Sequence, residues 1–333
     1  MPFENFLGNH SVIETLRHQL RTDRFPHALL FAGPAGVGKQ TLARWLAKAL
    51  NCKTVDSDFC DRCPSCRKVS EDSHPDVRIY APQGQFVRID QMREFSREAF
   101  YRPFEGRKRV FIIEQADKLT KEAANSILKT IEEPPDTSII FLVSDKPNDL
   151  LPTIRSRAQL YQFAPLAKEE LGRWLAAEKG YPLQDSALLA NISGGALGKA
   201  LGIDLDEYKK TRAEMMDLLN FCSVDFAYHS LANMVERMTS RKESEKAQFE
   251  LRLEVLYGLL HDLFQLKVDE TLAILNIDIK EPLLGVRRSF SFPQLLSATH
   301  LLDLIEQGAK RNLNRSLMVD RLVFGLSGII VDE

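Results

Sequence analysis

The chain lacks the features of a secreted, membrane-spanning or disulfide-stabilised protein. It has only five cysteines and two tryptophans in 333 residues, and no apolar run approaches the roughly 18 residues that span a bilayer. Residues 1–10 lack a basic region followed by an apolar one, so we expect no signal peptide. The formal net charge of −2 excludes a global basic field for nucleic acid. We therefore expect a cytoplasmic protein without membrane contact, in which any DNA contact is a local patch.

What is present is an ordinary globular composition, with 44% hydrophobic and 27% charged residues. In the first half, short apolar segments alternate with segments of helical periodicity. The expected strands are 27–32, 77–80, 109–113 and 138–143, and the expected helices include 42–50 and 119–131. This alternation predicts an α/β fold with a parallel sheet that helices cover on both faces. From Lys168 onward the helical periodicity dominates, which predicts an all-α second half.

A glycine-rich loop lies between the first expected strand and a helix, which is the context of a phosphate-binding loop. Its glycines let backbone N–H groups turn toward phosphate oxygens, and Lys39 adds a positive charge. The Mg²⁺-ligating hydroxyl of this motif should follow the lysine directly, but Gln40 stands there and Thr41 comes one position late. The loop therefore predicts bound ATP or ADP with a weakened site for Mg²⁺. Its candidate nucleotide-binding residues are Gly33, Gly36, Gly38, Lys39, Gln40 and Thr41.

The acidic motif of a nucleotide hydrolase is also altered. In such a site a buried strand ends in one carboxylate that steers Mg²⁺ and another that activates water. Here strand 109–113 is followed by Glu114 and Gln115. Because an amide cannot accept a proton from water, Gln115 predicts the loss of general-base catalysis.

Four of the five cysteines form a cluster, Cys52, Cys60, Cys63 and Cys66. Four thiolates at short spacing complete the tetrahedral shell of a closed, structural zinc site. The alternative is a set of small buried cysteines in a helix, which Pro64 and the neighbouring polar residues disfavour. We expect Cys222 to be a core residue.

An arginine-containing segment, 150–157, follows the strand at 138–143. An arginine at the edge of a nucleotide-binding domain can reach a neighbouring subunit's site and neutralise charge in its transition state. From the residues alone, Arg157 is either such a finger or a solvated, structurally paired side chain. A second basic group, made up of Arg102, Arg107, Lys108 and Arg109, is either a DNA contact or a solvated face, and the solvated face is favoured.

Together these segments resemble the clamp-loader branch of the AAA+ ATPases, as found in bacterial DNA polymerase III. The matching stretches are 24–39, the four-cysteine insert, 74–77, 123–135 and 151–157. The resemblance implies an AAA+ P-loop domain at 1–165 with a zinc module at 52–66, a three-helix lid at 166–208, and an all-α collar at 209–333 that closes a pentameric ring.

The resemblance also implies roles for single residues. The family's Ser-Arg-Cys motif supplies an arginine finger in trans, and Ser156-Arg157-Ala158 keeps that arginine. The lid of a motor subunit carries a sensor arginine, and Gly198 stands in its place. With Gln40 and Gln115, this makes three departures from a working ATPase.

These departures imply a non-motor, stator-like subunit whose own ATPase activity is weak or absent. It would belong to a DNA polymerase holoenzyme, together with tau/gamma-type and delta subunits in a hetero-pentamer that loads a sliding clamp on primed DNA. Two alternatives remain open. One is a self-sufficient motor-type ATPase, in which Thr41 reaches the metal and Glu114 serves as base. The other is a zinc scaffold that binds no nucleotide.

Overall fold

The computed structural model describes residues 2–223, 244–309 and 315–326. The chain divides into two compact units. The first contains the residues up to Ala167 together with Ala196–Lys199, and the second contains Lys168–Gly195 and the chain from Ala200 onward. The predicted domain boundaries at 165 and 208 stay a prediction.

The first unit is built on a five-stranded parallel sheet with the strand order β2-β3-β4-β1-β5. β1 lies between β4 and β5, so that Phe31 pairs with both Val143 and Tyr161. Because all strands run in one direction, the loops after β1, β3 and β4 meet at one edge of the sheet, where ligands of such folds bind. The strands are β1 (Ala28–Ala32), β2 (Val77–Tyr80), β3 (Arg109–Ile113), β4 (Ser138–Ser144) and β5 (Gln159–Gln162).

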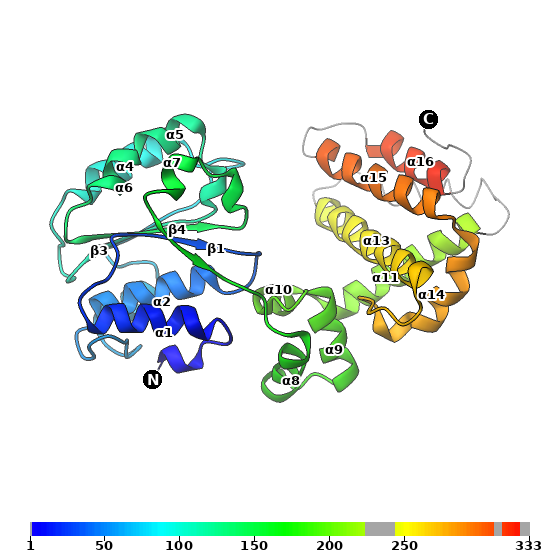
Figure 1. Cartoon of the computed structure of the whole chain (residues 1–333), viewed down its shortest axis with the longest axis horizontal. Coiled ribbons are helices and arrows are strands. Elements are labelled where there is room, and N and C mark those ends of the chain that lie inside the picture. Colours follow the sequence, from blue (N-terminus) through cyan, green and yellow to red (C-terminus); the bar gives the residue numbers. More distant parts are fainter. Residues whose placement is uncertain (1, 224–243, 310–314, 327–333) are drawn as a thin grey trace. The chain divides into compact units, whose positions relative to one another are not determined.

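Helices cover both faces of this sheet, as Figure 1 shows. Leu29 and Phe31 of β1 pack toward α1, α2 and α3, whereas Leu30 packs toward the helices α4 to α7. This arrangement, with apolar side chains on both faces, confirms the predicted fold class. The helices are α1 (His10–Arg21), α2 (Lys39–Asn51), α3 (Pro64–Ser70), α4 (Ile89–Ala99), α5 (Lys121–Ser126), α6 (Leu128–Glu132) and α7 (Pro152–Arg155). Short 3₁₀ turns are η1 (Pro2–Asn5), η2 (Ala116–Lys118) and η3 (Pro147–Asp149).

Two elements differ from the sequence-based expectation. The expected helix 119–131 is two short helices, α5 and α6, which meet at Ile127. The hydroxyl of Ser126 donates to the Ala123 carbonyl at 2.7 Å, a local bond that competes with the helical ladder. The sequence pattern does not predict β5, because it is a short edge strand in which only Tyr161 is buried.

The second unit is helical throughout its described part. The helices α8 (Lys168–Lys179) and α9 (Leu183–Ile192) pack together. The next helix, α10 (Leu197–Gly202), begins in the first unit and ends in the second. The remaining helices are α11 (Leu205–Ser223), α13 (Ser244–Val268), α14 (Lys280–Val286), α15 (Phe292–Ala309) and α16 (Arg315–Leu326), with η4 (Ile277–Ile279) and η5 (Arg287–Ser289). They share one apolar core, against which Cys222 packs as expected. None of the helices described is both long enough and apolar enough to span a bilayer.

Candidate nucleotide site, arginine finger and metal centre

The phosphate-binding loop leads from β1 into α2, as predicted. Gly36 and Gly38 have positive φ angles of 79° and 96°, which only glycine adopts without strain. A Cβ at Gly38 would lie 2.7 Å from the ring of Phe6, so the loop also needs glycine for space. Gln40 and Thr41 on the first turn of α2 are both exposed.

Lys39 is not free to meet a ligand in this structure. Its Nζ atom donates to the carbonyl oxygens of Gly33 at 2.6 Å and Pro34 at 2.5 Å. It also lies 2.8 Å from Oδ1 of Asp145, which follows β4, and its side chain is only 3% exposed. A lysine ammonium has three N–H donors, and these three partners occupy all of them.

The start of α10 packs directly on the same loop. The Gly198 N–H donates to the Gly36 carbonyl at 2.8 Å. A Cβ at position 198 would lie 3.0 Å from that carbonyl oxygen and 3.1 Å from the Gly36 Cα. Gly198 is therefore more than the absence of an arginine, because its lack of a side chain permits this close backbone contact.

The acidic motif after β3 is engaged by a cation. The Glu114 carboxylate lies 3.6 Å from the Arg44 guanidinium, which also pairs with Asp72. Gln115 adopts a left-handed conformation with φ of 49°, which is uncommon for a residue other than glycine. The motif thus offers one carboxylate, paired with Arg44, and one amide.

Arg157 follows α7 at the surface, with its side chain one third exposed. Its guanidinium bonds the Glu132 carboxylate through two nitrogens, with Nε–Oε2 at 3.0 Å and Nη2–Oε1 at 3.3 Å. Nη1 donates to the Thr153 carbonyl at 3.2 Å. The residue is thus both exposed and paired, so neither of the two interpretations of the sequence is removed.

The predicted metal ligands meet in space. The Sγ atoms of Cys52, Cys60, Cys63 and Cys66 all lie within 4.8 Å of one another. The N–H groups of Arg62 and Cys63 donate to the Cys60 sulfur at 3.4 and 3.3 Å. Bonding from Thr54 and from these two N–H groups lowers the pKa of Cys60 to about 6, which favours the thiolate that binds metal. This donor set fits a closed, four-thiolate metal site.

The cysteine cluster is tied into the first unit by aromatic packing. The ring of Phe59, beside Cys60, lies 5.3 Å from the rings of both Phe3 and Trp45. Lys48 of α2 lies over the same ring and pairs with Asp61 at 2.6 Å. Through these contacts the cluster braces the helix that carries the phosphate-binding loop.

Three members of the predicted basic group, Arg107, Lys108 and Arg109, form ion pairs or hydrogen bonds within the chain. Arg107 pairs with Asp56 at 2.8 Å, and Lys108 donates to the Asp136 carbonyl at 2.8 Å. Arg109 is buried and pairs with Glu98 at 3.1 Å. Arg102 and Arg107 are exposed and Lys108 is half-buried, so for these three the solvated face stays the prediction, whereas the buried Arg109 does not belong to it.

The loop that carries this group is held by two buried side chains. The carboxylate of Asp76 accepts the backbone N–H groups of residues 104, 105 and 106 at 2.7–2.8 Å. The Asn51 side-chain oxygen accepts those of residues 107 and 108 at 2.8 and 3.0 Å. Five consecutive N–H groups outside any helix or strand are thus satisfied by side chains.

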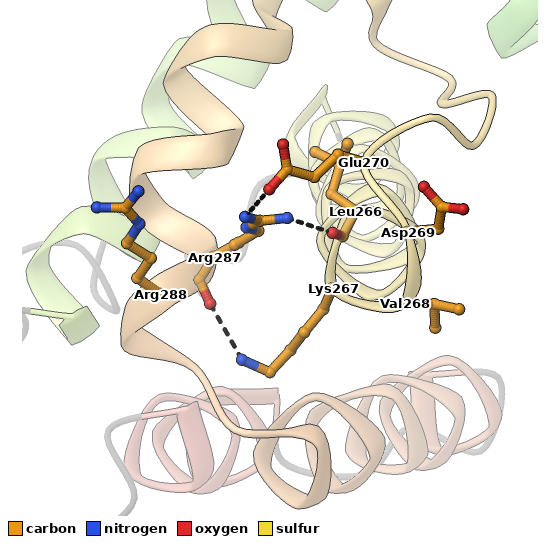
Figure 2. Close-up of a pocket in the computed structure, with 7 residues that line it drawn as sticks. All are labelled: Leu266, Lys267, Val268, Asp269, Glu270, Arg287 and Arg288. Atoms are coloured by element: carbon orange, nitrogen blue, oxygen red, sulfur yellow. Dashed lines mark hydrogen bonds and ion pairs between the residues drawn. The ribbon is translucent and has the colours of Figure 1, made fainter.

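The second unit contains a hollow beside the C-terminal end of α13 (Figure 2). Arg287 donates to the Leu266 carbonyl at 2.5 Å and pairs with Glu270, and Lys267 donates to the Arg287 carbonyl at 3.5 Å. The hollow contains none of the predicted site residues.

Comparisons with known proteins agree with the predicted family. A family model described as "DNA polymerase III, delta subunit" matches residues 8–167. DNA polymerase III subunit delta' of Bacillus subtilis (strain 168) is 27% identical over 94% of this chain and 93% of its own length. DNA polymerase III subunit gamma/tau of Mycoplasma pneumoniae is 31% identical, but the match covers 60% of this chain and only 30% of that relative.

The fold is shared with a solved structure as well. A gamma subunit-related protein of DNA polymerase III from Thermotoga maritima superimposes with a TM-score of 0.51 and 17% identity, covering 95% of this chain and 98% of its own. The full-length match to a delta' subunit agrees with the resemblance stated from the motifs. The chain is therefore similar over nearly its whole length to a delta' subunit of DNA polymerase III, and its first half matches the family model described for a delta subunit.

Proposed function

We propose that this chain is a non-motor subunit of a clamp loader and that it donates Arg157 to the ATP site of a neighbouring subunit. The observation that carries the proposal is a contrast between two sites. Lys39 is buried with all three donors bonded within the chain, whereas Arg157, although paired with Glu132, lies exposed at the surface after α7. A finger needs an exposed, oriented guanidinium that can reach the neighbouring site.

The altered motif residues support the same proposal. Gln40 lacks the metal-binding hydroxyl, Gln115 cannot act as a base, and Glu114 is paired with Arg44. Hydrolysis at this chain's own loop would therefore be weak or absent. Bound ATP or ADP without turnover remains part of the proposal, on the predicted loop residues.

The proposed partners follow from the family. They are tau/gamma-type and delta subunits in a hetero-pentamer, a sliding clamp, and primed DNA reached through the complex, in the cytoplasm. We also propose that the four clustered cysteines hold one structural zinc ion. That ion would supply no chemistry to ATP hydrolysis, because four thiolates leave no open coordination position.

The test is reconstitution of the loader with Arg157→Ala. An arginine finger contributes roughly 10³-fold or more to turnover at the site it serves, so ATP hydrolysis stimulated by clamp and primed DNA should fall clearly. Arg155→Ala is the matched control, because Arg155 is an exposed arginine two positions away that bonds Asn148. Unchanged hydrolysis with Arg157→Ala would contradict the proposal.

The isolated chain distinguishes the alternative functions. Robust ATP hydrolysis by the chain alone, lost in Lys39→Ala, would favour the self-sufficient motor-type ATPase. Failure of the chain to bind ATP or ADP, with zinc present and Arg157→Ala without effect, would favour the zinc scaffold.

A further inference from the structure

An acidic side chain from outside the phosphate-binding loop contacts the lysine of that loop. Oδ1 of Asp145 lies 2.8 Å from Nζ of Lys39, and the Asp145 side chain is 42% exposed. The other two partners of the lysine, the Gly33 and Pro34 carbonyls, belong to the loop itself. Asp145 is therefore the one anion, and the one partner from outside the loop, that the lysine meets in the described structure.

We infer that Asp145 determines whether this loop accepts a nucleotide, because its carboxylate takes the position on Lys39 that a phosphate oxygen would need. The inference rests on the proposed function, in which this chain's own ATP site works poorly. It names Asp145 as a residue that weakens nucleotide binding there. It extends beyond the altered motif positions, because Asp145 belongs to no nucleotide-binding motif predicted from the sequence.

The backbone at Asp145 is held in position by the end of the sheet. Oδ1 of Asp117, in η2, accepts the Ser144 hydroxyl at 2.6 Å and the Asp145 N–H at 3.2 Å. The Ser144 hydroxyl oxygen also accepts the Lys146 N–H at 3.1 Å. These bonds join the segment after β3 to the segment after β4. The backbone that carries Asp145 is thus anchored beside the loop, and its carboxylate contacts Lys39.

The electrostatic consequence is direct. A buried ammonium requires a partner, and Asp145 satisfies that requirement without a ligand. An incoming triphosphate would have to displace Asp145 from Lys39 and would then lie beside a like charge. Both effects oppose binding of the outer phosphates, which are the groups that Lys39 would recognise.

The experiment is calorimetric titration of the isolated full-length chain with ATP, with and without Mg²⁺. Asp145→Asn removes the charge and keeps a side chain of the same size. We expect the variant to bind ATP at least about tenfold more tightly than the unchanged chain, since like-charge contacts cost more than the 1.4 kcal/mol of a tenfold change. The double variant Lys39→Ala with Asp145→Asn should lose this gain, because the gain acts through the lysine.

Asp149→Asn is the matched control, since it removes one exposed acid from the same segment on η3. It should leave ATP binding unchanged. Equal or weaker binding in Asp145→Asn, with thermal unfolding showing a folded protein, would overturn the inference. So would an equal gain in Asp149→Asn, which would indicate a general charge effect. Asp145→Ala serves as a second variant if Asp145→Asn does not fold.

Failure here is distinguishable from failure of the proposed function. The proposed finger is tested by ATP hydrolysis at a neighbouring subunit, which would need Arg157. The titration measures only the affinity of the isolated chain's own loop for ATP. An unchanged affinity in Asp145→Asn with a strong Arg157→Ala effect would overturn the inference and leave the proposed function standing.

Discussion

Arg157 and Glu132 form a two-pronged ion pair within one chain, with nitrogen–oxygen distances of 3.0 and 3.3 Å. Glu132 is the last residue of α6, and Arg157 follows α7. Because both side chains are substantially exposed, the pair contributes only about 0–1 kcal/mol to folding. Its main effect is to fix the direction in which the guanidinium points.

Glu132→Ala should therefore reduce function more than stability. We expect thermal unfolding to change little, while hydrolysis in the reconstituted loader falls roughly three- to tenfold, since a misplaced catalytic group costs turnover. The loss should be smaller than that of Arg157→Ala. Glu133→Ala, which removes an exposed acid one position on, is the control. Equal hydrolysis by the loader with the unchanged chain and with the Glu132→Ala chain would contradict an orienting role.

Metal removal should destabilise the first unit. Purified protein should contain about one zinc ion per chain, and Cys63→Ser should lose it together with a lowered unfolding temperature. Cys222→Ser, which changes a cysteine on α11 in the other unit, should keep the metal. Elemental analysis and thermal unfolding check this expectation. Full stability of the metal-free protein would contradict a structural role.

A side chain at position 198 should lower the stability of the fold. The Cβ of Gly198→Ala would press on the Gly36 backbone at 3.0–3.1 Å, and overpacking of this kind costs roughly 1–3 kcal/mol. Gly202→Ala on the same helix meets open space and should be neutral or slightly stabilising. Chemical denaturation of both variants measures the difference. Equal stabilities would show that the contact at Gly36 relaxes without cost.

Asp76 should give the fold a measurable acid sensitivity. Burial alone raises the pKa of this carboxyl, but the N–H groups of residues 104–106 outweigh that effect and hold the pKa below its ordinary value of 3.8. The folded carboxyl thus takes up a proton at lower pH than the unfolded one. Its stabilisation is complete above pH 3.8 and is lost as the pH falls through the folded pKa.

The measurement compares Asp76→Asn with the unchanged chain by denaturation at several pH values. The variant should be less stable by roughly 1–3 kcal/mol at neutral pH, because an amide accepts fewer N–H bonds. This difference in the free energy of unfolding should become smaller as the pH falls below 3.8. Asp90→Asn, at an 88% exposed position on α4, should show no such gap. A gap independent of pH would mean that the carboxylate's charge is irrelevant.

The local patterns predict the frame of the molecule well. Continuous apolar runs are typical of strands buried on both faces, so β1, β3 and β4 lie where expected. The cysteine spacing likewise predicts four sulfurs that meet in space. The edge strand β5 gives too weak a pattern to predict, because it has only two apolar residues, Leu160 and Tyr161, between glutamines.

The partners of the site residues cannot be predicted in the same way. Asp145 meets Lys39, and Glu132 meets Arg157, only because the strand order brings distant loops to one edge or surface. The sequence pattern groups Arg109 with an exposed basic set, but this residue begins a buried strand and needs Glu98 as its counter-ion. Sequence shows which charges exist, and only topology shows how they pair.

The loop at residues 104–108 has an unusual dynamic consequence. Each of its five backbone N–H groups is bonded to Asp76 or Asn51, both almost fully buried. Amide hydrogens in irregular surface loops ordinarily exchange with solvent deuterium quickly, because few of them are held in stable hydrogen bonds. Here exchange requires either side chain to leave the interior. The loop should therefore retain its hydrogens about as long as the neighbouring strands, although it belongs to none of them.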